Sequence, residues 1–177
     1  MPDKEAGAAP DTIDTVAGLV PGGAVAALRR ARAKVDLHTR GSEAALFDPA
    51  LVALSLAERL HAARHAAALS RATGLAEVYR QRLLGVAGAV AIADMAAIDS
   101  GDAPALPPRL AAIATHVRRL VASPADASPA DLEALRAAGL STAAIVALSQ
   151  LVAFVIYQWR VIAVSAALDA RLAQESA

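Results

Sequence analysis

The sequence predicts an all-α protein. Alanine is the commonest of the 177 residues, and it has the highest helix propensity because it loses no side-chain entropy when a helix forms. Apolar residues recur at helical spacing, and no stretch shows the alternation of apolar and polar residues that indicates a half-buried strand. Apolar residues make up 56% of the chain but aromatic residues only 3%. We therefore expect closely approaching helices that bury little area per residue and depend on extensive contacts or on a partner subunit.

Start and stop signals divide the chain into helices. Residues 1–11 are polar and rich in Ala, Gly and Pro, so we expect a flexible tail followed by one domain over residues 12–177. Glycine and proline mark the ends of most segments, because glycine ends helices and proline cannot continue them. The expected helices span residues 12–19, 24–34, 35–47, 49–72, 75–98 with a bend near Gly85 or Gly88, 109–121, 129–138 and 142–172.

The clearest helix starts are the Asp-Pro pair at residues 48–49 and the Ser-Pro-Ala-Asp sequence at residues 128–131. In each, a polar side chain can cap free backbone N–H groups and proline suits the first helical turn. Gly139 ends one helix, and Ser141 begins the last. Three prolines make residues 99–108 the clearest break, which we interpret as a loop inside one domain.

The last helix carries no formal charge between Arg136 and Arg160, and residues 145–156 are strongly apolar. This length approaches that of a membrane span, but Gln150 and Gln158 interrupt it, and we favour a helix in the core or at a subunit interface. Because apolar residues lie all round it, we expect burial on every side. The sequence thus predicts a cytoplasmic homo-oligomer with no membrane contact.

Composition excludes several functional classes. With no cysteine, the chain has no disulfide, no thiolate nucleophile and no cysteine-ligated metal. Seventeen basic residues balance seventeen acidic ones, so no net field attracts nucleic-acid phosphates, and few aromatic residues can stack on bases. We expect no cofactor and no nucleic-acid partner.

The main candidate site lies on the expected helix at residues 49–72. Glu58, His61 and His65 fall within about 60° of one another on a helical wheel, in a stripe flanked by leucines. Three interpretations remain open. In the first, Glu58 is a partly buried acid paired with an arginine, and the two histidines lie at the surface or at an interface. In the second, Glu58 is a proton-transfer group whose pKa burial raises. In the third, it is a metal ligand together with the two histidines, whose i, i+4 spacing suits one ion.

Two basic features are secondary candidates. His116, Arg118 and Arg119 form a cluster on one helix, which is either a solvated face or a site for a substrate anion. Arg160 lies within the apolar last helix, where an unpaired charge would be costly to bury. We expect it to meet a carboxylate, with Glu58 and Glu77 as candidates, or else to contact an acidic substrate.

Two segments carry a family resemblance. The run Ser55-Leu56-Ala57-Glu58-Arg59-Leu60 before an alanine-rich helix, and the run over residues 132–160, resemble the carboxymuconolactone decarboxylase / alkylhydroperoxidase D-like family, in particular its peroxidase-related branch. The resemblance covers roughly residues 46–168. It implies a helical bundle of the alkylhydroperoxidase D-like type that assembles as dimers, trimers or hexamers.

The resemblance also implies a degenerate active site. Peroxidase members carry a glutamate, a Cys-x-x-Cys pair and a histidine. Glu58 matches the glutamate, whereas the two cysteine positions fall on Ser70 and Thr73 and the histidine position falls on Glu77. Because serine cannot replace a thiolate that attacks peroxide and then forms a disulfide, we expect no thiol peroxidase activity.

Two functions follow as expectations. The first is acid–base chemistry on a small organic acid or lactone, with Glu58 as the proton-transfer group and His61 or His65 assisting. The second is a non-catalytic structural or regulatory subunit of an oligomer, partnering a cysteine-bearing relative. A raised pKa of Glu58 in a closed pocket would favour the enzyme, and a Glu58 locked in an ion pair with Arg160, with no adjoining cavity, would favour the subunit.

Overall fold

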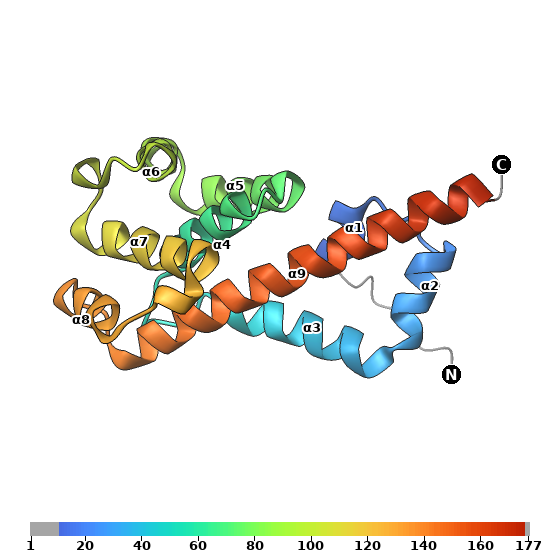
Figure 1. Ribbon diagram of the computed structural model, residues 1–177, viewed down its shortest axis with the longest axis horizontal. Helices are drawn as coiled ribbons and strands as arrows, with labels where there is room; N and C mark the ends of the chain where they lie inside the picture. Colours follow the sequence, from blue (N-terminus) through green and yellow to red (C-terminus); the bar gives the residue numbers. More distant parts are fainter. Residues whose placement is uncertain (1–10, 176–177) are drawn as a thin grey trace. The chain divides into compact units, whose positions relative to one another are not determined.

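The computed structural model describes residues 11–175, and within that range the fold is all-helical, as the sequence predicts (Figure 1). The α-helices are α1 (Thr12–Ala17), α2 (Ala24–Ala31), α3 (Ala33–Leu46), α4 (Leu56–Leu69), α5 (Thr73–Ala87), α6 (Val90–Ser100), α7 (Pro108–Ala122), α8 (Pro129–Ala137) and α9 (Thr142–Glu175). Two short 3₁₀-helices, η1 (Ala103–Ala105) and η2 (Pro124–Asp126), flank α7. The expected tail lies outside the described residues except for Asp11.

The chain divides into two compact units. The described part of the first comprises residues 11–40 and 160–175, and the second is Gly41–Trp159. The division falls within α3 and within α9, so each of these helices contributes residues to both units.

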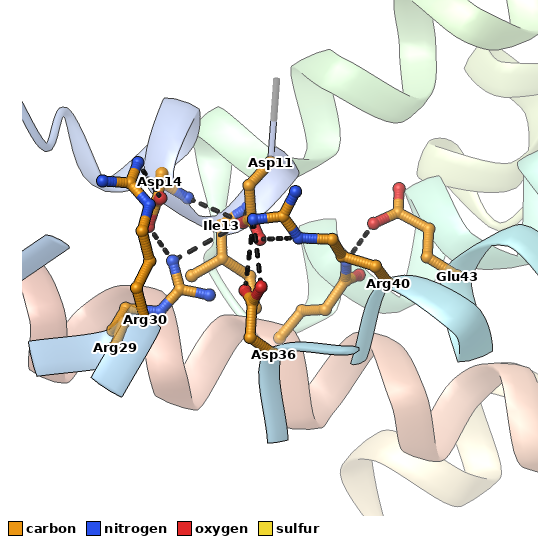
Figure 2. A network of polar contacts seen from close by, with 9 residues as sticks. Asp11, Ile13, Asp14, Arg29, Arg30, Asp36, Arg40 and Glu43 are labelled. Carbon is orange, nitrogen blue, oxygen red and sulfur yellow. Dashed lines mark hydrogen bonds and ion pairs between the residues drawn. The ribbon is translucent and has the colours of Figure 1, made fainter. Parts of the chain in front are cut away.

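The first unit combines a small apolar cluster with a network of ion pairs. Leu19, Val25 and Ala26 are buried together against Leu172 of α9. Asp11 caps α1, and its Oδ1 accepts hydrogen bonds from the backbone N–H groups of residues 13 and 14. Arginines from α2 and α3 pair with the aspartates of this unit: Arg29 with Asp11 and Asp14, Arg30 with Asp14, and Arg40 with Asp11 and Asp36 (Figure 2).

The second unit is built around α4, which packs against α5 and α7 (Figure 1). Four alanines of α4 are at most 1% exposed, and their small side chains let neighbouring helices approach closely. The part of α9 in this unit contributes five apolar core residues that are also at most 1% exposed. These nine residues are Ala62, Ala63, Ala66, Ala67, Ala144, Leu148, Leu151, Val152 and Val155.

The predicted start of α4 is wrong. The helix begins at Leu56 and not at residue 49, because Ser55 and Glu58 form a capping box. Ser55 Oγ accepts a hydrogen bond from the Glu58 N–H at 3.2 Å, and Glu58 Oε2 accepts one from the Ser55 N–H at 2.8 Å. The Asp48 carboxylate instead accepts the N–H of Ala50 at 2.9 Å within a turn. The helix therefore begins at the Ser55–Glu58 capping box and not at the Asp-Pro pair.

The helix predicted over residues 75–98 is two helices. α5 ends at Ala87 and α6 begins at Val90, with Gly88 between them at φ = 60°. This left-handed conformation is accessible to glycine but strained for most other residues, so the chain breaks at Gly88 and α5 runs straight through Gly85.

The prediction that the last helix is buried on every side is also wrong for a single chain. In α9, Val146 is 51% exposed, Val164 68% and Leu168 40%. Among the described residues, α9 is the one helix long and apolar enough to cross a membrane, although core helices of soluble proteins meet the same criterion. Only 33% of its most apolar window is buried, so much of its apolar surface lacks a partner within residues 11–175.

Candidate functional site

Glu58 lies in the first turn of α4 with both carboxylate oxygens engaged. Oε2 accepts the Ser55 N–H of the capping box, and Oε1 accepts a hydrogen bond from Arg109 Nε at 2.5 Å. Arg109, near the start of α7, also donates to the backbone carbonyls of Gly139 at 2.6 Å and Ala53 at 3.1 Å. The ion pair therefore joins the start of α4 to α7 and to the segment between α8 and α9. This is the partly buried acid paired with an arginine, the first of the three interpretations of Glu58.

These contacts determine the charge of Glu58. Partial burial raises its pKa, but the hydrogen bonds from Arg109 and Ser55 together outweigh burial and hold the pKa below its ordinary value. Glu58 is therefore ionised at neutral pH. Such a carboxylate is a weak proton acceptor and carries no proton to donate.

His61 and His65 follow Glu58 on α4, and both are buried within the chain, with exposures of 4% and 3%, so the expectation that they lie at the surface is wrong. The His61 Nε2 atom lies 3.8 Å from an oxygen of Asp94. Neither nitrogen of His65 has a hydrogen-bond partner. Burial lowers the pKa of both histidines, that of His65 to about 4, so both imidazoles are neutral at pH 7. Neither histidine contacts the Glu58 carboxylate, whose partners are Ser55 and Arg109.

The described residues contain no group of three or more His, Asp or Glu side chains arranged to hold a metal ion. The i, i+4 spacing of His61 and His65 is present on α4, but no third ligand joins it.

The other positions that the resemblance nominates, Ser70, Thr73 and Glu77, make no hydrogen bond or ion pair with Glu58, whose partners are Ser55 and Arg109. Ser70 follows the last residue of α4 and Thr73 is the first residue of α5. Glu77 is exposed and paired with Arg80 at 2.7 Å. Arg160 is exposed, so it needs no buried carboxylate, and the two candidate carboxylates are taken by Arg109 and Arg80.

A second polar network, which the sequence did not indicate, crosses the core between α5 and α9. The Tyr79 hydroxyl, fully buried, donates to Gln158 Oε1 at 2.5 Å, and Gln158 Nε2 donates to Glu43 at 3.2 Å. Arg82 completes the network by donating to Glu43 at 3.0 Å, and its guanidinium lies 4.3 Å from the centre of the Phe47 ring. Each polar group of the network has a partner within it. The network therefore stabilises the packing of these helices and is not an open binding site.

Arg59 is the other residue that sequence reasoning missed. It is 2% exposed, and its guanidinium donates to the carbonyls of Leu46 at 2.6 Å, Asp48 at 2.9 Å and Leu54 at 2.9 Å. Arg59 thereby fixes the non-helical segment that precedes α4. No local pattern marks it, because its partners are backbone atoms 5 to 13 residues away.

No family model, no curated protein and no solved structure matches this chain. Function is therefore inferred from the contacts of the residues themselves.

Proposed function

We propose that this protein is a non-catalytic, oligomer-forming member of the carboxymuconolactone decarboxylase / alkylhydroperoxidase D-like family, acting in the cytoplasm as a structural or regulatory subunit. The observation that carries the proposal is the state of Glu58. Its two oxygens serve as a helix cap and as the partner of Arg109. Glu58, the one acid that matches the glutamate of the family, thus stabilises the fold.

The alternative of an acid–base enzyme has less support. A proton-transfer carboxyl needs a free oxygen, a pKa near the working pH and room for a substrate. Glu58 has a lowered pKa and two occupied oxygens. The cavity found between α6 and α7 is lined by other residues. The absent Cys-x-x-Cys pair removes the thiol route as well.

The oligomer proposal is supported by α9. Its exposed apolar side chains, Val146 in the second unit and Val164 and Leu168 in the first, need cover from water. A second copy of this chain, or a cysteine-bearing relative with the same fold, would supply it.

Replacing Glu58 tests the structural role. We expect Glu58→Gln to lower the free energy of unfolding by about 1 kcal/mol at pH 7, after solvent screening of this partly exposed pair. Because the folded-state pKa is lowered, the contribution of Glu58 is present above its ordinary pKa and is lost as the pH falls through the lowered folded-state value. The difference between wild type and variant should therefore shrink below pH 4.5. Chemical denaturation followed by circular dichroism measures both effects.

The matched control is Glu133→Gln, which removes an exposed acid paired with Arg136 on α8 and should leave stability almost unchanged. Turnover is assayed in parallel with an alkyl hydroperoxide plus a dithiol, and with a small lactone carboxylate. Rates at background for the wild type support the proposal. Turnover by the wild type that Glu58→Gln abolishes in a folded protein would overturn it.

Assembly is tested by light scattering at micromolar concentration. We expect a mass that is a multiple of 18.0 kDa, and we expect Val146→Asp to shift it toward the monomer, because an aspartate at a buried interface would be desolvated without a partner. The control is Thr142→Asp, at the exposed start of α9. The neighbouring position Ala147 is half-buried and is therefore not used. A monomeric wild type, or one recovered only with membranes, contradicts the oligomer proposal.

A further inference from the structure

A cavity of about 260 Å³ lies between α6, η1 and α7 in the second unit. Its apolar lining is continuous with a small hydrophobic cluster formed by Ala97, Ile98, Leu106 and Leu110. Alanines of α7 face the same space, so the walls carry short side chains that leave room for a ligand. The volume is just below the range of about 300–1,000 Å³ that is common for drug-sized ligands. Polar atoms are exposed in the lining beside these apolar side chains, so the cavity suits a small molecule with an apolar part and a polar end.

Two polar side chains of α7 line this cavity, Thr115 and Arg118. They are three residues apart and thus share one face of the helix. Arg118 donates one long hydrogen bond, from Nη2 to the Ile98 carbonyl at 3.5 Å. Across the described residues 11–175, no carboxylate pairs with Arg118. The guanidinium of Arg118 therefore lines the cavity with most of its N–H donors unused.

The neighbouring charges do not neutralise Arg118. Asp99, which follows Ile98 on α6, is bound by Arg64, and Asp131 is the partner of Arg119. The positive charge of Arg118 acts toward the interior as well. The pKa of His65 is lowered first by burial and next by Arg118. Asp99 acts on His65 in the opposite direction, so the support for anion binding is the Arg118 guanidinium itself, which pairs with no carboxylate among the described residues.

We propose that this cavity binds a short or medium-chain aliphatic monocarboxylate, with the carboxylate on Arg118 and Thr115 and the alkyl chain among Ile98, Leu106 and Ala114. A planar guanidinium with free N–H donors can form two parallel hydrogen bonds to the two oxygens of a carboxylate. A single exposed arginine above apolar walls offers too few donors for a phosphate dianion. The absence of aromatic side chains from the lining leaves nothing for a nucleobase to stack on. The site is independent of Glu58 and of the proposed function above.

Binding is measured by isothermal titration calorimetry of the full chain with butyrate, hexanoate and octanoate at physiological salt. We expect affinity to rise roughly fourfold for each added methylene until the cavity is filled. Arg118→Gln should weaken hexanoate binding about tenfold, whereas hexanol, which lacks the charge, should bind wild type and variant alike. Arg118 is exposed, so the variant should remain folded, which circular dichroism verifies.

Two further variants distinguish binding in the cavity from nonspecific attraction of the anion to surface cations. Arg136→Gln removes an exposed cation on α8 and should leave hexanoate affinity unchanged. Ala114→Leu adds volume at the wall and should abolish hexanoate binding while Arg118 remains in place. Equal affinity for all three acids, equal binding by Arg118→Gln, or inorganic phosphate binding as tightly as hexanoate would each overturn the proposal.

Discussion

Replacing Arg59 with methionine is expected to lower the free energy of unfolding by about 3 kcal/mol, which corresponds to a drop in Tm of about 10 °C for a chain of this size. The Arg59 guanidinium is buried and donates to three backbone carbonyls at 2.9 Å or less, those of Leu46, Asp48 and Leu54. Methionine fills similar volume but donates nothing, so these acceptors lose their partner and the segment before α4 loses its anchor. Urea denaturation followed by circular dichroism measures the change.

Two variants identify the cause. Arg80→Met removes a partly exposed arginine of α5 and should cost no more than about 0.5 kcal/mol. Arg59→Lys keeps the charge, but one ammonium group cannot span carbonyls that a fork of donors reaches, so we expect it to recover less than half of the loss. Hydrogen exchange should quicken over residues 47–55 in both Arg59 variants. If Arg59→Met is as stable as Arg80→Met, the anchoring role is wrong.

Arg59 also explains why the start of α4 was mispredicted. The Asp-Pro pair at residues 48–49 and the Ser-x-x-Glu pattern at residues 55–58 are both valid start signals, and local propensity does not rank them. A helix begun at residue 49 would use the Asp48 and Leu54 carbonyls, which Arg59 binds instead, so contacts between residues 11 and 5 apart decide where the helix begins. The end of α8 at Gly139, by contrast, depends on a local glycine signal that the sequence displays, and there prediction and structure agree within two residues.

The candidate site was likewise predictable only in part: the sequence indicates its residues but not their contacts. The sequence places Glu58, His61 and His65 on one helical face, and all three do lie on α4. Which atoms meet them was not predictable, because Arg109 comes from α7, 51 residues away. The pairing of Tyr79 with Gln158 spans 79 residues and has no sequence signal. The sequence indicates that Arg118 belongs to a basic cluster, but only the structure shows that it lines a cavity.

Acidification is expected to destabilise the protein between pH 6.5 and about 4, chiefly through His65. Its folded-state pKa is lowered to about 4 by burial and then by Arg118, from an ordinary value of 6.5. Between these two values the unfolded chain binds a proton that the folded protein excludes, so stability falls as the pH falls through this window. The difference of about 2.5 pH units corresponds to ~3 kcal/mol lost by pH 4. His61 and His116, whose pKa values burial also lowers, act in the same direction.

Replacing His65 with leucine should flatten this pH dependence. Neither imidazole nitrogen of His65 has a partner, so an apolar side chain breaks no hydrogen bond and should leave stability at pH 7 unchanged or slightly higher. At pH 4 the variant should exceed the wild type by ~3 kcal/mol. His38→Leu, at an exposed position on α3, is the matched control and should follow the wild-type profile. Denaturation at half-unit steps from pH 7 to 4 gives the comparison. Parallel profiles for His65→Leu and wild type would show that the buried imidazole is not the group whose protonation opens the fold.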